Sequence, residues 1–200
     1  EHTKSQGHSQ VVLGQGPHYL FQGVPEENPG AVEFFQKRGY QAAWSSVNMR
    51  LDLAGYDPGQ VDIPPVPEGV AFRLLETGEE AALLAAVEDA QPAWLEFYQG
   101  CPSPILVAVE QGRLVGFAMV PPEGGRFLGD VEKPGSLECV GVVKSHRNRG
   151  IGMGMVLAGI RWLKEQGCGS IELRYVALED WYHKVGFCTF QRMWMGEKNL

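Results

Sequence analysis

The sequence predicts an α/β domain with a mixed sheet, preceded by a short N-terminal piece. Strand and helix patterns alternate through residues 70–200, which is typical of this class. Residues 57–69 hold four prolines and two glycines, so we expect a linker there rather than a helix or a central strand. This linker divides residues 1–56 from residues 70–200.

Local signals place the elements of the longer piece. Thr77–Glu80 has the form of a capping box, which predicts a helix that ends near Ala90. Gln111-Gly112 separates two apolar runs, which predicts an antiparallel hairpin. An apolar stripe at helical spacing predicts a helix over 153–166. The other predicted helices are 92–99 and 179–185, the predicted strands are 70–76, 105–110, 114–120, 137–143, 170–176 and 187–195, and a loop covers 121–135.

Composition and charge exclude several function classes. The net charge of −7 argues against a general binder of nucleic acid or anionic membranes. No apolar run approaches the roughly 18–20 residues that a membrane span needs. The four cysteines form no CxxC pair and the five histidines form no cluster, so we expect no metal site. We interpret the cysteines as reduced thiols of a cytoplasmic protein.

A glycine-rich turn joins the predicted strand 137–143 to the helix that follows. Gly150, Gly152 and Gly154 lie in this turn, and Lys144, Arg147 and Arg149 add three positive charges to it. Glycines let a ligand approach the backbone, while free amides and the helix dipole favour an anion. The turn therefore predicts a phosphate site, and the alternative is a tight turn without a ligand.

The spacing of the turn distinguishes among phosphate ligands. No Gly-Lys-Ser/Thr is present for a Walker loop, and Met155 stands where a dinucleotide fingerprint needs its third glycine. Arg147-Asn-Arg-Gly-Ile-Gly152 instead resembles the pyrophosphate loop of the GCN5-related N-acetyltransferases (GNAT). Trp181–Phe187 resembles the Tyr-x-Lys-x-Gly-Phe motif of the same superfamily.

The resemblance implies a twisted, mostly antiparallel mixed sheet flanked by helices, and acetyl-CoA as the acyl donor. The residues implied in acetyl-CoA binding are Val140, Val142, Arg147, Asn148, Arg149, Gly150, Ile151, Gly152 and Met153. Tyr182 stands where the family has its general acid, the alternative being a core aromatic. Glu138 is the candidate base, the alternative being a solvated strand residue, and an amide near Val140 is the candidate oxyanion donor.

The acceptor side departs from the family pattern. Tyr175 and Leu178 occupy positions where the family often has Asn and Ala. We expect Trp94, Phe97 and Tyr98, with the loop 121–135, to line the acceptor side.

Residues 28–40 resemble the second motif again, 147 positions earlier. Phe35 aligns with Tyr182 and Gly39 with Gly186, and the family's Asn and Ala are present, but Phe35 has no hydroxyl. Residues 1–56 therefore resemble the last third of a degenerate GNAT repeat, the alternative being a chance match. We expect this piece to pack on the C-terminal domain or on a partner chain, which leaves a homodimer open.

Two functions of different class follow. The first is an N-acetyltransferase that moves an acetyl group from acetyl-CoA to a primary amine by direct attack. The second is a non-catalytic acyl-CoA-binding module of the same fold, which the incomplete repeat and Tyr175 and Leu178 motivate. The sequence does not identify the acceptor.

Overall fold

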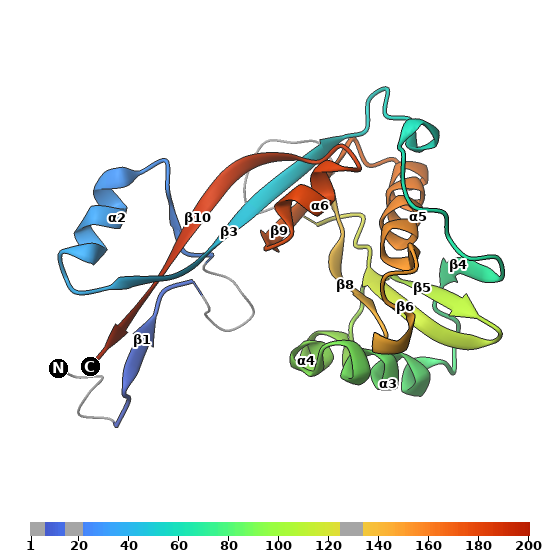
Figure 1. The fold of residues 1–200 in the computed structure, drawn as a ribbon, viewed down its shortest axis with the longest axis horizontal. Helices are drawn as coiled ribbons and strands as arrows, with labels where there is room; N and C mark the ends of the chain where they lie inside the picture. The colour runs from blue at the N-terminus through green and yellow to red at the C-terminus, as the bar shows by residue number, and fades with distance from the viewer. Residues whose placement is uncertain (1–6, 15–21, 125–133) are drawn as a thin grey trace. The chain divides into compact units, whose positions relative to one another are not determined.

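The computed structural model describes residues 7–14, 22–124 and 134–200 (Figure 1). These residues form two compact units that interleave along the chain. Unit 1 contains residues up to Arg50 together with Arg174–Asp180 and Cys188–Leu200, and unit 2 contains Leu51–Leu173 and Trp181–Phe187. The units differ from the predicted pieces 1–56 and 70–200, because the last strand of the chain belongs to the same unit as the N-terminal strands.

Unit 2 is built around an antiparallel sheet of four strands. Its order is β4 (Val70–Leu74), β5 (Ile105–Glu110), β6 (Arg113–Met119) and β8 (Glu138–Val142). The predicted hairpin between β5 and β6 is confirmed. Its two turn residues both have positive φ, 52° at Gln111 and 74° at Gly112, as a tight hairpin turn requires.

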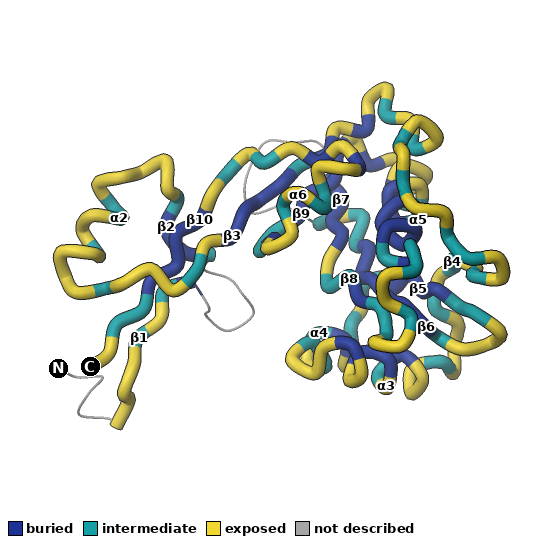
Figure 2. The backbone as a smooth tube through the Cα atoms, viewed as in Figure 1, coloured by how far each residue is buried: buried dark blue, intermediate teal, exposed yellow. Residues whose placement is uncertain are grey.

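Four helical segments accompany this sheet: α3 (Glu80–Ala90), η3 (Pro92–Trp94), α4 (Leu95–Tyr98) and α5 (Ile151–Glu165). Most of α5 is buried, as Figure 2 shows by its dark tube. The apolar stripe of the sequence explains this burial, since Met153, Val156 and Ile160 are all at most 5% exposed. A second cluster joins α3 and α4 to the sheet around Phe117, which is fully buried.

The predicted capping box at Thr77 is wrong. The helix α3 begins at Glu80, and no side chain caps its first turn. The Glu79 carboxylate instead accepts hydrogen bonds from the Glu76 amide (2.9 Å) and from Arg73 (2.6 and 2.7 Å). The bonds from Arg73 and Glu76 lower the pKa of Glu79 to about 2.

Three shorter elements complete unit 2. A strand that the sequence did not predict, β7 (Pro134–Ser136), pairs in parallel with the start of β9 (Ser170–Val176). Beside them, the Leu53 amide donates to the Gly169 carbonyl at 3.0 Å. The linker holds one short helical turn, η2 (Pro58–Gln60), and otherwise lacks helix and strand. Most of the predicted loop 121–135 lies outside the described residues.

Unit 1 contains a long two-stranded ribbon. The strand β3 (Gln41–Asp52) pairs antiparallel with β10 (Cys188–Asn199). Two short strands, β1 (Gln10–Val12) and β2 (Val24–Pro25), also pair with β10. The helix α2 (Pro29–Gln36) precedes β3 and has no buried residue, and Phe34 on it is 48% exposed.

The prediction of an α/β fold with a mixed, mostly antiparallel sheet is confirmed. The element bounds shift by a few residues, as helix ends and strand ends commonly do. The helix α5 begins at Ile151 rather than at Met153, and α6 (Glu179–His183) ends two residues before the predicted Val185. The strand predicted over 137–143 is β8, and β10 continues four residues past the predicted Met195.

Candidate functional site

The candidate site lies within unit 2, where β8 is an edge strand. On one side β8 pairs with β6, and the Val143 amide just beyond it donates to Val115 O at 3.0 Å. Because backbone groups alternate along a strand, those of Val142 point to the opposite edge. The Val142 carbonyl there accepts from Arg147 Nε at 3.1 Å. Among the described residues, no other strand pairs with this outer edge of β8, and Arg147 is the partner of one of its carbonyl groups.

A bulge interrupts β8 at Cys139 and Val140. Phe117 pairs with Gly141 and Met119 with Glu138, so Cys139 and Val140 both stand opposite Ala118. Cys139 has a φ of 47°, which is uncommon for a residue with a side chain. Tyr98 holds the bulge, because its hydroxyl donates to Cys139 O at 2.8 Å.

The loop after β8 leads into the first turn of α5. Gly150, with φ 77°, precedes the helix, and a Cβ there would lie 2.8 Å from the Pro65 carbonyl. The Gly154 amide donates to Gly150 O at 3.0 Å. Within the described part of the chain, no acceptor is bonded to the amides of Ile151, Gly152 and Met153. These three amides meet the requirement of an anion site at a helix N-terminus.

The predicted glycine set divides between two roles. Gly152 lies inside α5, and a Cβ on it would be in ordinary contact with Trp181 at 3.5 Å. Gly154 is also inside the helix, where a Cβ would lie 2.6 Å from the Phe72 ring and 2.7 Å from Val66. We therefore interpret Gly154 as a packing glycine, and the expectation that it lines the phosphate site is corrected.

The cations of this loop mostly bind the protein itself. Arg147 Nη2 donates to Ala90 O at 2.9 Å, at the end of α3, in addition to its bond to Val142 O. Arg149 forms a two-point ion pair with Glu110 (2.7 and 3.1 Å), and His146 Nε2 lies 3.1 Å from the same carboxylate. The Arg149 hydrogen bonds lower the pKa of Glu110. Arg147 and Arg149 therefore fix the shape of the loop.

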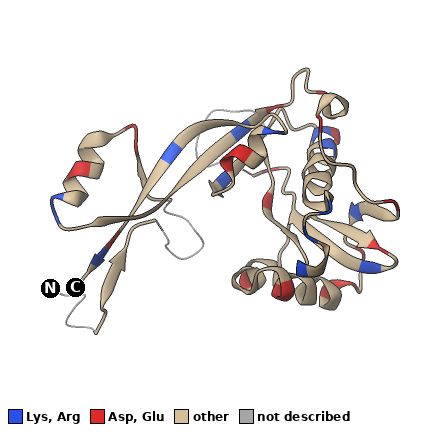
Figure 3. Ribbon diagram, in the orientation of Figure 1, with Lys and Arg blue, Asp and Glu red and all other residues tan. Residues whose placement is uncertain are grey.

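Acidic groups anchor the basic loop from α3. The charged side chains of α3 are all acidic, as Figure 3 shows, and its Asp89 accepts from the Lys144 amide at 2.7 Å. No hydrogen bond or ion pair is recorded for Lys144 Nζ among the described residues, and Lys144 is exposed. Of the three predicted cations, Lys144 is thus the one with no side-chain partner among the described residues, while Arg147 bonds only neutral carbonyl groups and keeps its charge unneutralised.

Tyr182 lies close to the bulge of β8. Burial raises the pKa of Tyr182, and the nearby Cys139 thiol raises it further. Its ring packs edge-on against Trp181 at 4.8 Å and against Phe187 at 5.8 Å between ring centroids. No hydrogen-bond partner of the Tyr182 hydroxyl is recorded among the described residues, so its proton is available to a ligand.

The two other ionisable groups at the bulge are Glu138 and Cys139. Burial raises the pKa of Cys139 to about 12, and the Glu138 carboxylate adds to the rise. A thiol with this pKa is protonated at neutral pH and is a poor nucleophile. Glu138 is exposed at the first position of β8, where water reaches it.

Sequence reasoning placed Tyr98 on the acceptor side but missed its contact with the bulge. Tyr98 is 3% exposed, and burial raises its pKa well above the ordinary value. Its ring packs edge-on against Phe117 at 5.2 Å between centroids, and Trp94 packs against the same ring at 6.5 Å. Phe97 also packs against the cluster around Phe117. Tyr98 is therefore part of the core beneath the bulge, and the half-buried Trp94 and Phe97 pack against that core.

The described residues lack a metal-binding cluster and a membrane-spanning helix. No group of three His, Cys, Asp or Glu side chains is arranged to hold a metal ion within residues 7–14, 22–124 and 134–200. Over the same residues, no helix combines the length and the apolar character that a bilayer crossing requires.

Several known proteins are similar to this chain in sequence or in fold. The mycothiol acetyltransferase of Actinosynnema mirum is 29% identical over 158 residues, which cover 72% of this chain and 51% of that protein, so the chain spans about half of that relative. The glucosamine N-acetyltransferase region of a fungal multi-domain GH3 β-N-acetylglucosaminidase superposes with a TM-score of 0.80 at 25% identity. That match covers 98% of this chain and 26% of the other.

A tandem GNAT protein from the clavulanic acid biosynthesis pathway has the same fold. Its TM-score is 0.66 at 18% identity, over 98% of this chain and 66% of that one. The model of the acetyltransferase (GNAT) family matches residues 72–187, which is more than half of the chain and includes β8, the loop and Tyr182. The chain therefore belongs to the acetyltransferase (GNAT) family.

Proposed function

We propose that this chain transfers an acetyl group from acetyl-CoA to a primary amine by direct attack. The observation that carries the proposal is the row of unbonded amides at the start of α5, next to the open edge of β8 and the bulge beside Tyr182. These features suit different parts of acetyl-CoA, which is a long thioester molecule. The amides suit a pyrophosphate, and the strand edge suits an amide-containing arm that pairs as a strand does.

The residues present fit acetyl-CoA. The pyrophosphate would be held by the amides of Ile151, Gly152 and Met153, with Arg147 and Arg149 fixing the loop and Lys144 supplying charge. Asn148 and Gly150 supply the positive φ values, 61° and 77°, that turn the loop into the helix. Val140 and Val142 present the backbone edge of β8.

The transfer needs three proton or charge steps. The amine nitrogen attacks the thioester carbonyl carbon, the C–N bond forms, and the C–S bond breaks as the sulfur leaves with the electron pair. An amide at the bulge near Val140 stabilises the oxyanion, and Glu138 takes the amine proton, through water. Tyr182 donates a proton to the leaving sulfur, and its raised pKa keeps that proton in place until the sulfur becomes negative.

We propose that the acceptor is an amine on a sugar. Its support is the printed name of the structure with a TM-score of 0.80, a glucosamine N-acetyltransferase region. The first test is titration calorimetry with acetyl-CoA, followed by CoA release over glucosamine, a diamine and a lysine peptide. Binding below millimolar concentration and release with at least one amine are expected, and no binding at that concentration would contradict the proposal.

The second candidate is an acyl-CoA-binding module without turnover. Two residues support it: Tyr175 has a φ of 56° and Leu178 is 61% exposed, at positions where the family often has Asn and Ala. Tight acetyl-CoA binding without CoA release over the whole amine panel would favour this module.

We also propose that residues 1–56 are the end of a degenerate first repeat. The support is local: Gly39 and Gly186 both have positive φ (82° and 91°) and end helices 147 positions apart. The fold shared with a tandem GNAT protein agrees with it. Proteolysis and structure determination of a chain extended at its N-terminus would test this assignment.

A further inference from the structure

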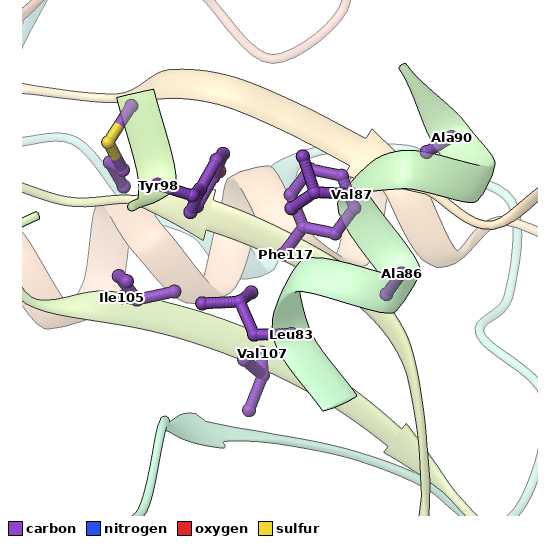
Figure 4. Packing of buried hydrophobic residues seen from close by; sticks show 9 residues of the cluster. Leu83, Ala86, Val87, Ala90, Tyr98, Ile105, Val107 and Phe117 are labelled. Atoms are coloured by element: carbon purple, nitrogen blue, oxygen red, sulfur yellow. The ribbon is translucent and has the colours of Figure 1, made fainter. Parts of the chain in front are cut away.

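A pocket of about 330 Å³ lies inside unit 2, between the α3–α4 layer and the β4–β5 edge of the sheet. Leu74, Leu83, Leu84 and Ile105 form an aliphatic part of its wall. The polar residues Glu80, Gln99 and Ser103 also line it. Figure 4 shows Leu83, Tyr98 and Ile105, from α3, α4 and β5, in the layer between the helices and the sheet. The volume is at the low end of the range for small-molecule sites.

Tyr98 belongs to both the pocket and the candidate site. Its side chain lines the pocket, while its hydroxyl donates to the Cys139 carbonyl in the bulge at 2.8 Å. A second lining residue, Cys101, lies 3.4 Å from Met119 Sδ, and Met119 pairs with Glu138. Tyr98 therefore contacts both the pocket and the carbonyl group in the bulge.

The ring of Tyr98, which lines the pocket, is held in one position. It is 3% exposed, and it packs edge-on against Phe117, which is fully buried. The hydroxyl bond fixes the other end of the side chain. A ring held at both ends cannot turn aside without breaking a buried hydrogen bond.

We propose that Tyr98 limits the donor to short acyl groups by separating the acyl position at the bulge from this pocket. The inference rests on the proposed function, since it places the acyl group beside Cys139 and Val140. With Tyr98 in place, an acyl chain longer than a few carbons meets the ring. With a small residue in its place, the chain passes into an aliphatic pocket that already exists.

The experiment compares hexanoyl-CoA with acetyl-CoA by titration calorimetry, which needs no knowledge of the acceptor. In the wild-type chain we expect hexanoyl-CoA to bind no tighter than acetyl-CoA. In Tyr98→Ala we expect the ratio of the two affinities to shift toward hexanoyl-CoA by at least about tenfold, since each methylene placed in an apolar pocket is worth about that factor.

Two further variants identify the pocket as the destination of the chain. Leu84→Phe alone narrows the pocket wall and should leave acetyl-CoA binding unchanged, because Leu84 lies on α3 and supplies none of the amides, the β8 backbone groups or the hydroxyl to which the donor is assigned. Added to Tyr98→Ala, Leu84→Phe should reverse the gain for hexanoyl-CoA. Tyr98→Leu opens less space and provides the same comparison if Tyr98→Ala does not fold, which thermal unfolding reports.

The outcomes distinguish a failure of the inference about Tyr98 from a failure of the proposed function. A folded Tyr98→Ala or Tyr98→Leu chain that binds acetyl-CoA with an unchanged ratio overturns the inference but not the proposed function. A gain that Leu84→Phe does not reverse also overturns it, because the chain then lies elsewhere. If the wild-type chain binds neither thioester, the proposed function itself fails.

Discussion

Two turns of this chain have the same backbone and different chemistry. At 35–40 and at 182–187, a short helix ends with the same hydrogen bonds: the Tyr40 amide donates to Phe35 O at 3.2 Å, and the Phe187 amide donates to Tyr182 O at 3.3 Å. The ring pairs match as well, with Phe35 and Tyr40 at 5.5 Å and Tyr182 and Phe187 at 5.8 Å between centroids.

The surroundings of the two turns are not alike. Phe187 is 1% exposed, whereas the helix before Tyr40 has no buried residue. Tyr182 adds a hydroxyl beside the bulge of β8, and Phe35 has none. The same turn therefore ends a helix both with and without a hydroxyl beside a strand edge, and the proposed function assigns chemistry only to the turn that has both.

The largest effect on stability should come from the aromatic residue that ends each turn. Phe187→Ala should lower the free energy of unfolding by about 3–5 kcal/mol, because it empties a fully buried site. Tyr40→Ala should have a clearly smaller effect, because Tyr40 is only half-buried. Chemical denaturation of both variants measures the difference, and equal losses would contradict the contrast in burial.

The two glycine variants should differ less in stability than the two aromatic variants. Gly39→Ala and Gly186→Ala each force a side chain into the left-handed region, at about 1–2 kcal/mol. At Gly186 the new Cβ also lies 3.2 Å from the Tyr56 ring, whereas at Gly39 the nearest atom is on Lys198 at 3.7 Å. Thermal unfolding should therefore rank Gly186→Ala as the less stable variant, and the reverse order would contradict the packing.

The helix before the first turn has a cap that can be removed alone. The Asn28 side chain accepts from the Ala31 amide at 3.3 Å at the start of α2. Asn28→Ala should lower stability by about 1 kcal/mol, and Asn28→Ser should retain most of it, since serine also caps helices. Denaturant titration distinguishes the two, and an equal loss in both would show that the side-chain bond is unimportant.

The smallest effect is a pH dependence at Tyr182, which the matching Phe35 cannot have because it carries no hydroxyl. The pKa of Tyr182 is raised in the folded chain, so its stabilising effect is present below the ordinary pKa of about 10 and is lost as pH rises above it. Tyr182→Phe should lessen the loss of stability above that pH. Phe35→Tyr serves as the control, and a Tyr182→Phe profile identical to wild type would contradict the assignment.

The sequence was sufficient for elements whose pattern is local. The hairpin at Gln111-Gly112 and the buried stripe of α5 follow from residues close together in the chain. The prediction of a capping box was wrong. The helix α3 begins only at Glu80, and the Glu79 side chain before it pairs with Arg73 on β4, which the spacing of the residues does not reveal. The strand β7 was missed because Pro134 and Gly135 do not resemble strand residues, and only pairing with β9 defines it.

The sequence predicted which residues make up the candidate site, but only part of their arrangement in space. The amides at α5 follow from the glycine pattern. The partners of Arg147 and Arg149 do not, because Ala90 and Glu110 lie on elements far away in the sequence. The hydrogen bond from Tyr98 to Cys139 depends on a bulge, and a single sequence carries no signal for a bulge at this position.

The proposed function requires the Tyr182 hydroxyl to donate a proton to the leaving sulfur, which Phe35 cannot do in the matching turn. The most direct test measures turnover and acetyl-CoA affinity in Tyr182→Phe, with Phe35→Tyr as the matched control. We expect Tyr182→Phe to lower turnover by about a hundredfold with nearly unchanged affinity, and Phe35→Tyr to change neither. Turnover at the wild-type level in Tyr182→Phe would contradict the account.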